Sequence, residues 1–509
     1  MTGPLWTLLE LPATIDPSRE ILRFRERSWT LEQLRDRAIS LADDLPAGHI
    51  GIMDVNSDVL VALAYACFGA NVPVALVNYR LRSDELAKLA KLDTFSTLVV
   101  GNRYEETARS AYAAASLGSA AVLIDADQAT VGDMSLAASN VTTREAFAGV
   151  ILFTSGTTAL PKPVFLRAAE VATYVMASTP ACPPDTRSES TLLTMPLYHV
   201  AGLIGLLRSV FAGRRVVLHE QFDETTWLEA VSRGDITHAF VVPTMLDRIL
   251  EAPGFGASDL SSLRVVTYGG GPMPQTVIER ALERFPSSVG FVSTYGMTEA
   301  GGTVTVLDAE DHDAARAGDA VARRRLGSVG RPVPDVRLAI VDAHHVSLPA
   351  GSTGEVFVVG DRAPEADEAT KWIGERNLRT GDLGHLDDDG YLYLRGRADD
   401  MIIRGGENIA PLEVEEVLRS HPAVADCAVV GIPDKTWGER VVAAVVLRSA
   451  ADSEALIRHC RVSLASFKVP EKVHILDRLP NNGVGKLLRR SLRQQLQGPS
   501  IPRSVENQG

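Results

Sequence analysis

The chain has 509 residues, of which 45% are hydrophobic and 23% charged, and its formal net charge at pH 7 is −13. This length exceeds what one hydrophobic core usually supports, so more than one domain is expected. The acidic balance argues against a general nucleic-acid binder or a protein of anionic membrane surfaces, because both would need a basic excess.

The sequence also predicts the compartment. The N-terminus has no basic segment followed by an apolar core, and the apolar run Val59–Cys67 is too short to cross a bilayer, so neither export nor integral membrane association is expected. The cysteines lack the spacing of a metal site and are typical of reduced, mostly buried thiols. They are Cys67, Cys182, Cys427 and Cys460. A cytoplasmic location is therefore expected.

Residues 20–150 alternate between helical and strand-like patterns. Thr30 and Gln33 have the spacing of a capping box at the start of a helix. Strand-like runs at Ile50–Val55 and Val72–Val77 flank an apolar helix at Val59–Phe68. This alternation predicts a mostly parallel sheet covered by helices. Packing explains this region without any chemical role.

The next stretch carries a candidate phosphate-binding loop. The apolar run Val150–Phe153 predicts the end of a buried strand, and residues rich in hydroxyls and glycine follow it. Backbone N–H groups, hydroxyls and a nearby lysine suit a phosphate. A Walker loop is excluded, because Gly-Lys-Ser/Thr does not follow Gly156 five residues later. An ordinary surface loop is the alternative. The candidates are Thr154, Ser155, Gly156, Thr157, Thr158 and Lys162.

Later strand ends carry further candidates. Tyr198 and His199 stand among small residues that could line a pocket, although a lone histidine is more often a hydrogen-bonded core residue. A strand at Val265–Gly269 runs into Gly269–Pro272, where glycines would let a flat ring lie against the backbone. A plain strand-to-helix turn is the alternative for those glycines.

Thr298 and Glu299 follow another strand and a glycine turn. A carboxylate near bound phosphates is normally repulsive, but it suits a site in which Mg²⁺ bridges those phosphates. A solvated turn glutamate is the alternative. Further on, Asp382 could accept hydrogen bonds from both hydroxyls of a ribose.

The C-terminal part is predicted to be a small second domain. The turn Asp387–Gly390 joins a predicted hairpin, and the charged run Arg397–Asp400 then marks a break. About 100 residues remain after it, which is enough for a small domain. A helix is expected at 411–420, and Lys486 lies on a glycine-rich loop before a basic helix. Residues 498–509 are expected to be a disordered tail.

Together these stretches resemble the adenylate-forming superfamily of acyl- and aryl-CoA synthetases, adenylation domains that load carrier proteins, and luciferases. The resemblance covers nearly the whole chain. It implies an α/β fold, with a large N-terminal domain of β-sheets and covering helices and a small mobile α+β domain at the C-terminus. The implied boundaries are 1–396 for the AMP-binding domain, 397–400 for the hinge and 401–497 for the lid. The motifs, in the family's order, are Thr154–Val164, Pro196–Leu203, Gly269–Pro274, Ser293–Glu299, Thr380–Asp382, Arg397–Asp400, Gly405–Pro411 and Gly485–Lys486.

The resemblance also implies roles for individual residues. The loop 154–162 would hold the β- and γ-phosphates, Asp382 and Arg397 the ribose, and Thr298 and Glu299 the α-phosphate and Mg²⁺. Lys486 would bridge the acid and the α-phosphate, and Asp399 would be the hinge. The remaining ATP-binding candidates are Gly269, Gly270, Gly271, Pro272, Ser293, Thr294, Tyr295, Gly296 and Met297. The acid would contact Tyr198, His199, Val241, Tyr268 and Met297, and coenzyme A would contact Gly405 and Gly406.

Several positions depart from the family pattern. Ala159 and Pro163 replace glycines near the phosphate loop, and Pro163 also removes an N–H after the lysine. Asn377 and Leu378 stand where an aromatic residue usually precedes Thr-Gly-Asp, and Asn481 and Asn482 replace a basic pattern before Lys486. These departures remove no reacting group, and they favour a specialised enzyme, for example one of secondary metabolism.

The implied reaction uses ATP and Mg²⁺ to convert an organic acid into an acyl-adenylate and pyrophosphate, followed by transfer to the thiol of coenzyme A. The absence of a basic residue from 293–297 favours a neutral acid over a dicarboxylate. The alternatives are another acceptor (a separate carrier protein, an amine or nitrogen oxyacid chemistry) and an inactive nucleotide-binding protein. A homodimer is considered, and the oligomeric state stays open.

Overall fold

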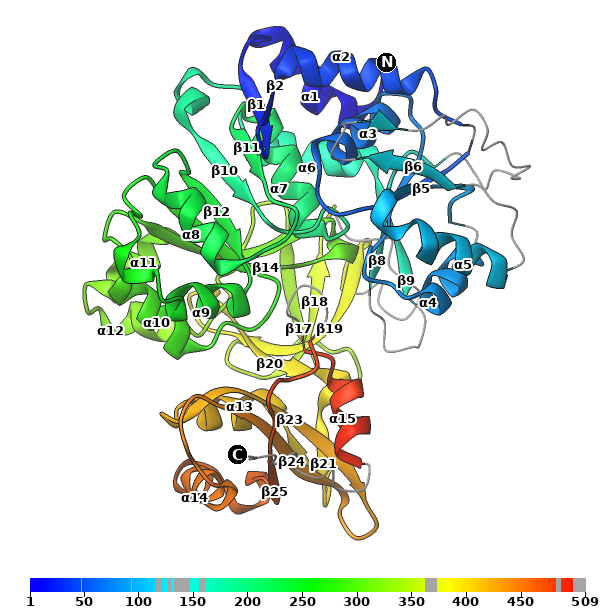
Figure 1. Cartoon of the computed structure of the whole chain (residues 1–509). Helices are drawn as coiled ribbons and strands as arrows, with labels where there is room; N and C mark the ends of the chain where they lie inside the picture. Colours follow the sequence, from blue (N-terminus) through cyan, green and yellow to red (C-terminus); the bar gives the residue numbers. More distant parts are fainter. Residues whose placement is uncertain are drawn as a thin grey trace, which may run out of the picture. The chain divides into compact units, whose positions relative to one another are not determined.

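The computed structural model describes residues 1–46, 48–92, 94–115, 121–125, 130–131, 147–154, 161–361, 373–481 and 487–497 (Figure 1). It divides into two compact units. Unit 1 comprises residues 1–270, 284–304 and 308–313, and unit 2 comprises residues 271–283, 305–307 and 314–509. The boundaries expected at 1–396 and 401–497 stay a prediction, and the tail expected at 498–509 lies outside the described residues.

One sheet of unit 1 has the strand order β7-β6-β5-β3-β4-β8-β9. The strands β3 to β6 and β8 pair in parallel, whereas β7 and β9 pair antiparallel at the two edges. The mostly parallel sheet that the alternating pattern predicts is therefore confirmed. The bounds are β3 Ile50–Met53, β4 Val74–Leu76, β5 Thr97–Gly101, β6 Ala121–Asp125, β7 Thr130–Val131, β8 Gly149–Thr154 and β9 Lys162–Arg167.

A second sheet of unit 1 contains the run β14-β13-β12-β10-β11-β1-β2. All neighbours in this run pair in parallel except β1 and β2. Parallel pairing places the carboxyl ends of successive strands at one edge, where ligands bind in such sheets. The bounds are β1 Glu20–Phe24, β2 Arg27–Thr30, β10 Ser190–Leu193, β11 Arg215–Leu218, β12 His238–Val241, β13 Val265–Gly269 and β14 Gly290–Met297.

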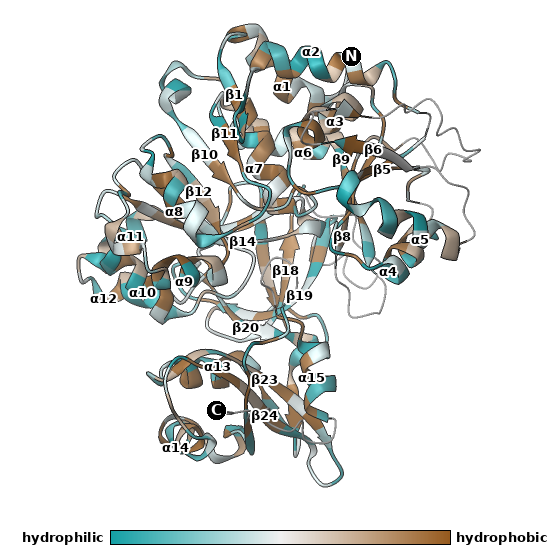
Figure 2. Ribbon diagram, viewed as in Figure 1, coloured by the Kyte–Doolittle hydropathy of each residue, from teal (hydrophilic) through white to brown (hydrophobic). Residues whose placement is uncertain are grey.

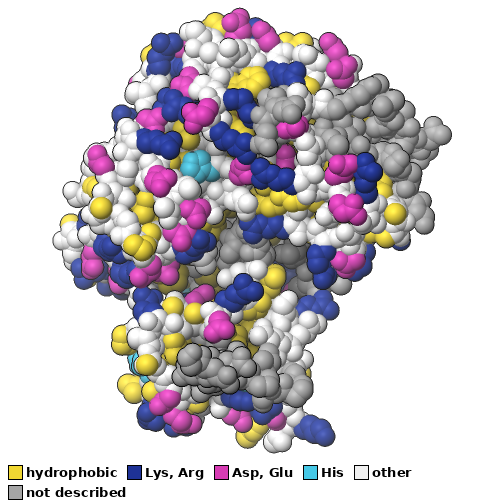
Figure 3. All heavy atoms as spheres, in the orientation of Figure 1, with side chains coloured by type: hydrophobic (Ala, Val, Ile, Leu, Met, Phe, Trp, Pro, Cys, Tyr) yellow, Lys and Arg dark blue, Asp and Glu magenta, His cyan; other side chains and the backbone are white. Residues whose placement is uncertain are grey.

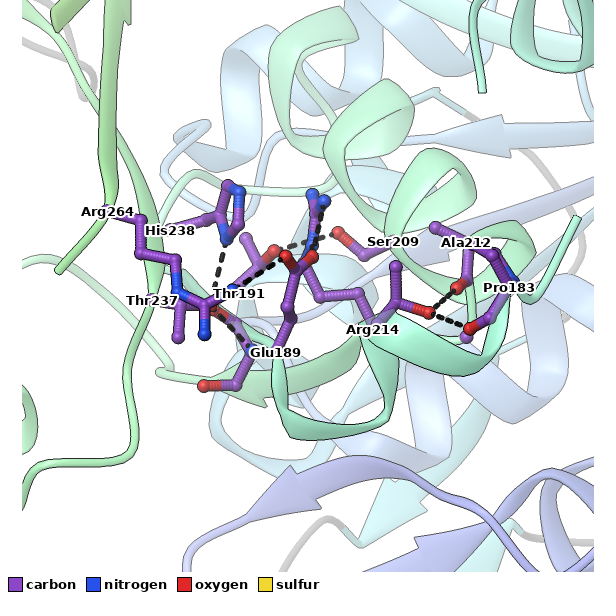
Figure 4. A network of polar contacts seen from close by, with 12 residues as sticks. Pro183, Glu189, Thr191, Ser209, Ala212, Arg214, Thr237, His238 and Arg264 are labelled. Atoms are coloured by element: carbon purple, nitrogen blue, oxygen red, sulfur yellow. Dashed lines mark hydrogen bonds and ion pairs between the residues drawn. The ribbon is translucent and has the colours of Figure 1, made fainter. Parts of the chain in front are cut away.

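The opposite, amino-terminal edge of this second sheet carries a polar network (Figure 4). Glu189 accepts from Arg214 at 2.9 Å and from Arg264 at 3.2 Å. The Thr237 hydroxyl and Nδ1 of His238 form a hydrogen bond of 2.8 Å. These residues come just before or at the start of their strands, so the network lies away from the edge expected to bind ligands.

Local sequence explains two helices of unit 1. Thr30 accepts from the N–H of Gln33 at 3.2 Å, and Gln33 accepts from the N–H of Thr30 at 2.8 Å, which confirms the capping box. The apolar helix α3 has all twelve of its residues buried, so it lies inside the unit. The helices with all their residues in unit 1 are α1 Pro4–Ile15, α2 Leu31–Ala42, α3 Asp58–Gly69, α4 Ser83–Ala90, α5 Glu105–Ala115, α6 Ala168–Ser178, α7 Val200–Phe211, α8 Glu224–Ser232 and α9 Pro243–Glu251.

Unit 2 contains an antiparallel sheet of order β17-β18-β19-β20. The predicted hairpin is confirmed, because β19 and β20 pair antiparallel around the turn at Asp387, whose Oδ1 accepts the N–H groups of Asp389 and Tyr391 at 3.0 and 2.8 Å. The bounds are α12 Ala320–Arg325, β16 Arg331–Pro332, β17 Arg337–Val341, β18 Gly354–Val359, β19 Asn377–Leu386 and β20 Leu392–Arg397. The elements β15 Gly302–Leu307, α10 Gln275–Arg284 and α11 Ala309–Arg316 have residues in both units.

The rest of unit 2 contains the order β22-β21-β24-β23, with β25 parallel to β24. Side chains alternate along β23, so Cys427 and Val429 enter one core cluster while Ala428 and Val430 enter another. The resulting apolar strands are brown in Figure 2. The bounds are β21 Ile402–Arg404, β22 Glu407–Ile409, α13 Pro411–Arg419, β23 Val424–Asp434, β24 Gly438–Leu447, α14 Ser453–Ser463, β25 Lys472–Ile475 and α15 Arg489–Gln497.

Candidate active site

The candidate phosphate loop connects two paired strands. Thr154 ends β8 and pairs with Lys162, which begins β9, and the Thr154 hydroxyl donates to the Lys162 carbonyl at 3.5 Å. The chain therefore leaves and re-enters the sheet at one place, and the Lys162 side chain there is exposed. Pro163 follows on β9, which is an edge strand, where a missing N–H is tolerated. The candidates Ser155, Gly156, Thr157, Thr158 and Lys486 lie outside the described residues.

The turn that carries Thr298 and Glu299 lies beside this hairpin. Both residues belong to the short 3₁₀ turn η5, Thr298–Ala300, and η5 contacts β9. Gly296 approaches the carbonyl of Gly302 so closely that a Cβ would lie 2.1 Å from that oxygen, and Gly301 has a φ of +68°. The backbone before and after η5 thus requires glycine. The strand that begins at Lys162 and the turn that carries Glu299 are therefore in contact.

Two neighbouring strands, β13 and β14, carry most of the adenine-slot candidates. Gly269 on β13 is opposite Thr294 on β14, and a Cβ at Gly269 would lie 2.4 Å from the Thr294 carbonyl. Gly270 follows with a φ of +78°. The two strands approach so closely at this edge that Gly269 has no room for a side chain. The remaining candidates on β14, which are Ser293, Tyr295, Gly296 and Met297, share this carboxyl end, whereas Gly271 and Pro272 are exposed residues of unit 2.

Two acid-pocket candidates, Val241 and Tyr268, lie in the core. Val241 is 0% exposed and Tyr268 2% exposed. The Tyr268 hydroxyl and Nε2 of His312 lie 2.9 Å apart, and Nδ1 of His312 is 2.7 Å from the Asp308 carbonyl. A carbonyl only accepts, so Nδ1 carries the proton and Nε2 accepts from the tyrosine. Burial raises the pKa of Tyr268. These contacts account for the burial of Tyr268, and its contact with the acid stays a prediction.

Tyr198 and His199 occupy the turn before α7. The His199 N–H donates to the Pro196 carbonyl at 3.0 Å, and the rings of Tyr198 and His199 lie 4.7 Å apart. Tyr198 is 6% exposed and packs edge-on against Tyr79 at 5.5 Å. Burial raises its pKa, and its hydroxyl has no hydrogen-bond partner among the described residues. An unpaired buried hydroxyl is costly, so it is a natural contact for a polar atom of a ligand.

The ribose candidates pair across the β19–β20 hairpin of unit 2. Arg397 Nη1 lies 3.2 Å from Asp382 Oδ1, and the Asp382 side chain is 14% exposed. The Thr380 hydroxyl donates to the Val356 carbonyl at 2.7 Å and accepts the Asp382 N–H at 3.0 Å. Gly381 between them has a φ of +72°. The carboxylate is therefore held in one orientation, with a cation beside it.

The coenzyme A candidates form the turn between β21 and β22. Gly405 and Gly406 are exposed and have φ values of +59° and +89°. The Gly405 N–H donates to the Trp437 carbonyl at 2.7 Å, and a Cβ at Gly405 would lie 3.0 Å from the indole ring. Trp437 is 52% exposed. The sequence reasoning missed this tryptophan, although a lone aromatic residue in a polar turn is a recognisable signal.

The protein side chains at this site would bind a magnesium ion only together with phosphate oxygens of the nucleotide. Among the described residues no group of three or more His, Cys, Asp or Glu side chains could hold a metal ion alone. Glu299 forms no ion pair within the described parts of the chain and is half-buried. Mg²⁺ is commonly bound by one or two carboxylates plus substrate phosphates, and Glu299 would supply such a carboxylate.

No helix within the described ranges has the length and apolarity needed to cross a membrane. On the visible face, acidic and basic side chains are interspersed on each unit (Figure 3).

Known proteins match the chain over nearly its whole length. The AMP-binding enzyme family matches residues 9–363, and the AMP-binding enzyme C-terminal domain matches residues 413–486. A 2-succinylbenzoate–CoA ligase from Bacillus cereus is 32% identical and aligns with 97% of this chain and 98% of its own.

Solved structures agree with this match. The o-succinylbenzoate CoA synthetase of Bacillus subtilis, in complex with its acyl-adenylate intermediate, is 29% identical with a TM-score of 0.78, and the match covers 96% of this chain and 98% of that one. The same enzyme has also been solved with ATP and magnesium. An amide bond synthetase from Marinactinospora thermotolerans is 28% identical with a TM-score of 0.79, over 96% of this chain and 99% of that one.

Proposed function

The chain belongs to the AMP-binding enzyme family and is an AMP-forming acid–thiol ligase, and from this premise we propose that its substrate is an aryl carboxylic acid. The enzyme uses ATP to activate an acid as an acyl-adenylate, releases pyrophosphate and transfers the acyl group to coenzyme A. The observation that carries the aryl assignment is the end-to-end similarity to 2-succinylbenzoate–CoA ligases. The ring cluster of Tyr79, Tyr198 and His199 supports it, because aromatic faces suit a flat substrate.

In the first half-reaction, the acid carboxylate attacks the α-phosphorus of ATP, and the bond from that phosphorus to pyrophosphate breaks. Both reactants are anions, so the protein must neutralise charge and align them. Lys162 lies at the base of the loop assigned to the β- and γ-phosphates, and Glu299 would hold Mg²⁺, which when bound neutralises phosphate charge. The Asp382 carboxylate accepts hydrogen bonds from the ribose hydroxyls, and Arg397 orients that carboxylate. Lys486 stabilises the charge that develops between acid and phosphate.

In the second half-reaction, the thiol of coenzyme A attacks the acyl carbon and AMP leaves. The glycine turn at Gly405 and Gly406 borders the pantetheine in this proposal. Asp399 acts as the hinge that exchanges Lys486 for this turn, so that one site serves both steps.

The acid is expected to carry neutral groups near Met297, since none of the residues 293–297 is basic. Pyrophosphate release is measured with benzoate, 2-succinylbenzoate, succinate and a medium-chain fatty acid, with and without coenzyme A. We expect the highest rate with an aryl acid and a thioester product that mass spectrometry identifies. A Lys486→Ala variant should lose about 10²–10³-fold of the rate. A preference for succinate or the fatty acid would reject the aryl assignment.

A second acceptor is an amine, which the similarity to the amide bond synthetase favours. The same assay with an amine in place of coenzyme A distinguishes the two possible acceptors. Amide formation that exceeds thioester formation at equal acceptor concentration would establish an amine as the natural acceptor.

The four cysteines are free and buried, which fits a reducing compartment, so we place the enzyme in the cytoplasm. A homodimer is the assembly to test first, and light scattering after size-exclusion chromatography measures it.

A further inference from the structure

Asn56 is a buried amide that joins segments far from it in the sequence. It follows β3 and is 1% exposed. Its Nδ2 donates to the carbonyls of Met195 at 2.9 Å and His219 at 3.1 Å, and its Oδ1 accepts the N–H of Leu197 at 3.0 Å. Two carbonyls and one N–H thereby fix which end of the amide carries the NH₂ group. Both donors and one of the two acceptor sites are used.

These bonds hold the chain just beyond the ends of two strands. The pairing of β10 with β11 is continued by the His219 N–H, which donates to the Leu193 carbonyl at 3.0 Å. After that point the β10 segment reaches Pro196, which has no N–H to donate. The Asn56 side chain replaces the missing strand-to-strand hydrogen bonds, because it binds Met195 before the proline and Leu197 after it.

The other side of the same turn is held by α7. A Cβ at Gly202, in the first turn of α7, would lie 2.3 Å from the Pro196 carbonyl, so the helix packs directly on the turn. That carbonyl also accepts the His199 N–H at 3.0 Å. Asn56 and Gly202 therefore fix the turn from two sides, and little backbone freedom remains for Tyr198 and His199.

We propose that Asn56 is a positioning residue for the acid substrate, because it fixes the turn that presents Tyr198 and His199. This inference rests on the proposed function, in which those two side chains border the acid. None of the three hydrogen bonds reaches the turn of Thr298 and Glu299, so the effect should fall on the acid and spare ATP. A misplacement of about 1 Å can cost roughly 10²-fold in an aligned reaction.

Two variants test this. Asn56→Asp keeps the size and the acceptor but removes both donors, and Asn56→Leu removes every polar group. Pyrophosphate release gives KM for the acid, KM for ATP and kcat, while circular dichroism and thermal melting report folding. We expect KM for the acid to rise about 10–100-fold and KM for ATP to change less than about threefold. If neither variant folds, Asn56→Ser, whose hydroxyl can still donate to one carbonyl, undergoes the same comparison.

Ser209→Ala is the matched control. The Ser209 hydroxyl on α7 is buried and donates to Thr191 on β10 at 3.1 Å, so it joins the same two elements without touching the turn (Figure 4). Its loss should lower the melting temperature and leave KM for the acid unchanged. The inference is overturned if the Asn56 variants raise both KM values together, or if they differ from Ser209→Ala only in stability. Failure of the proposed function looks different, since wild-type protein would then prefer succinate or the fatty acid to the aryl acids.

Discussion

Arg489, the first residue of α15, donates to the carboxylate of Glu415 on α13 at 2.6 Å, and Glu415 is only 1% exposed. Arg489 also donates to the Val429 carbonyl at 2.7 Å and lies 3.3 Å from Asp400. Burial alone would raise the pKa of Glu415, but Arg489 and Arg419 outweigh it and the pKa is lowered. Arg489, three residues after Lys486, thus joins α13, β23 and the segment of the proposed hinge.

Glu415→Ala should therefore destabilise unit 2 by about 3–5 kcal/mol, because it removes the buried carboxylate opposite Arg489, to which only the Asp400 carboxylate would remain, and the acceptor of the Val429 N–H. Urea unfolding followed by circular dichroism measures the change. Arg493→Ala is the control, since Arg493 and Glu439 are 3.7 Å apart and more exposed, and it should cost less than about 1 kcal/mol. Equal losses for both variants would contradict a special role for the buried pair.

Asp382→Ala should raise KM for ATP about 10–100-fold, because hydrogen bonds to a charged group contribute about 1.5–3 kcal/mol. ATP–pyrophosphate exchange measures this. Asp389→Asn is the control: Asp389 pairs with Arg325 at 2.8 Å at the turn of the same hairpin, far along the strand from Asp382. A similar KM for ATP in the Asp382 variant and wild type would remove this residue from the nucleotide site.

The sequence predicted helices, strands and turns better than contacts between side chains that are distant in the chain. The capping box of Thr30, the parallel strands and the β19–β20 hairpin follow from local patterns, and all are present. The hydrogen bond between Tyr268 and His312 joins residues 44 positions apart, so periodicity could not reveal it, and the contact of Tyr268 with the acid stays a prediction. Asn56 was missed for the same reason, because its partners Met195 and Leu197 are 139 and 141 positions away. Such pairs depend on tertiary packing, which no local pattern contains.

Glu299→Gln should raise the Mg²⁺ concentration needed for half-maximal activity at least about tenfold, because a neutral amide is a weaker ligand of a hard cation than a carboxylate. The melting temperature should hardly change, since Glu299 has no ion pair within the described residues to lose. A Mg²⁺ titration of the exchange reaction measures the shift, with Glu310→Gln on the exposed face of α11 as control. An unchanged titration curve would place the metal elsewhere.

His238 should make the stability of unit 1 depend on pH. Burial lowers its pKa to about 4, with Arg214 and Arg264 adding to the effect and Glu189 opposing it. The folded state therefore holds the neutral imidazole, whereas the unfolded chain takes up a proton near pH 6.5. Stability from this group is present above pH 6.5 and is lost as the pH falls toward 4, by at most about 3 kcal/mol.

His238→Gln keeps a polar group beside Thr237 but cannot be protonated, so its free energy of unfolding should fall less than that of wild type between pH 6.5 and 4. Denaturant unfolding at several pH values measures both curves. Wild-type protein contains other histidines that titrate here, including His219, whose pKa burial also lowers, so the difference between the two curves isolates His238. His344→Gln, on an exposed turn, should leave the curve as in wild type. Parallel curves for wild type and His238→Gln would show that the imidazole accepts a proton as readily in the folded chain as in the unfolded one.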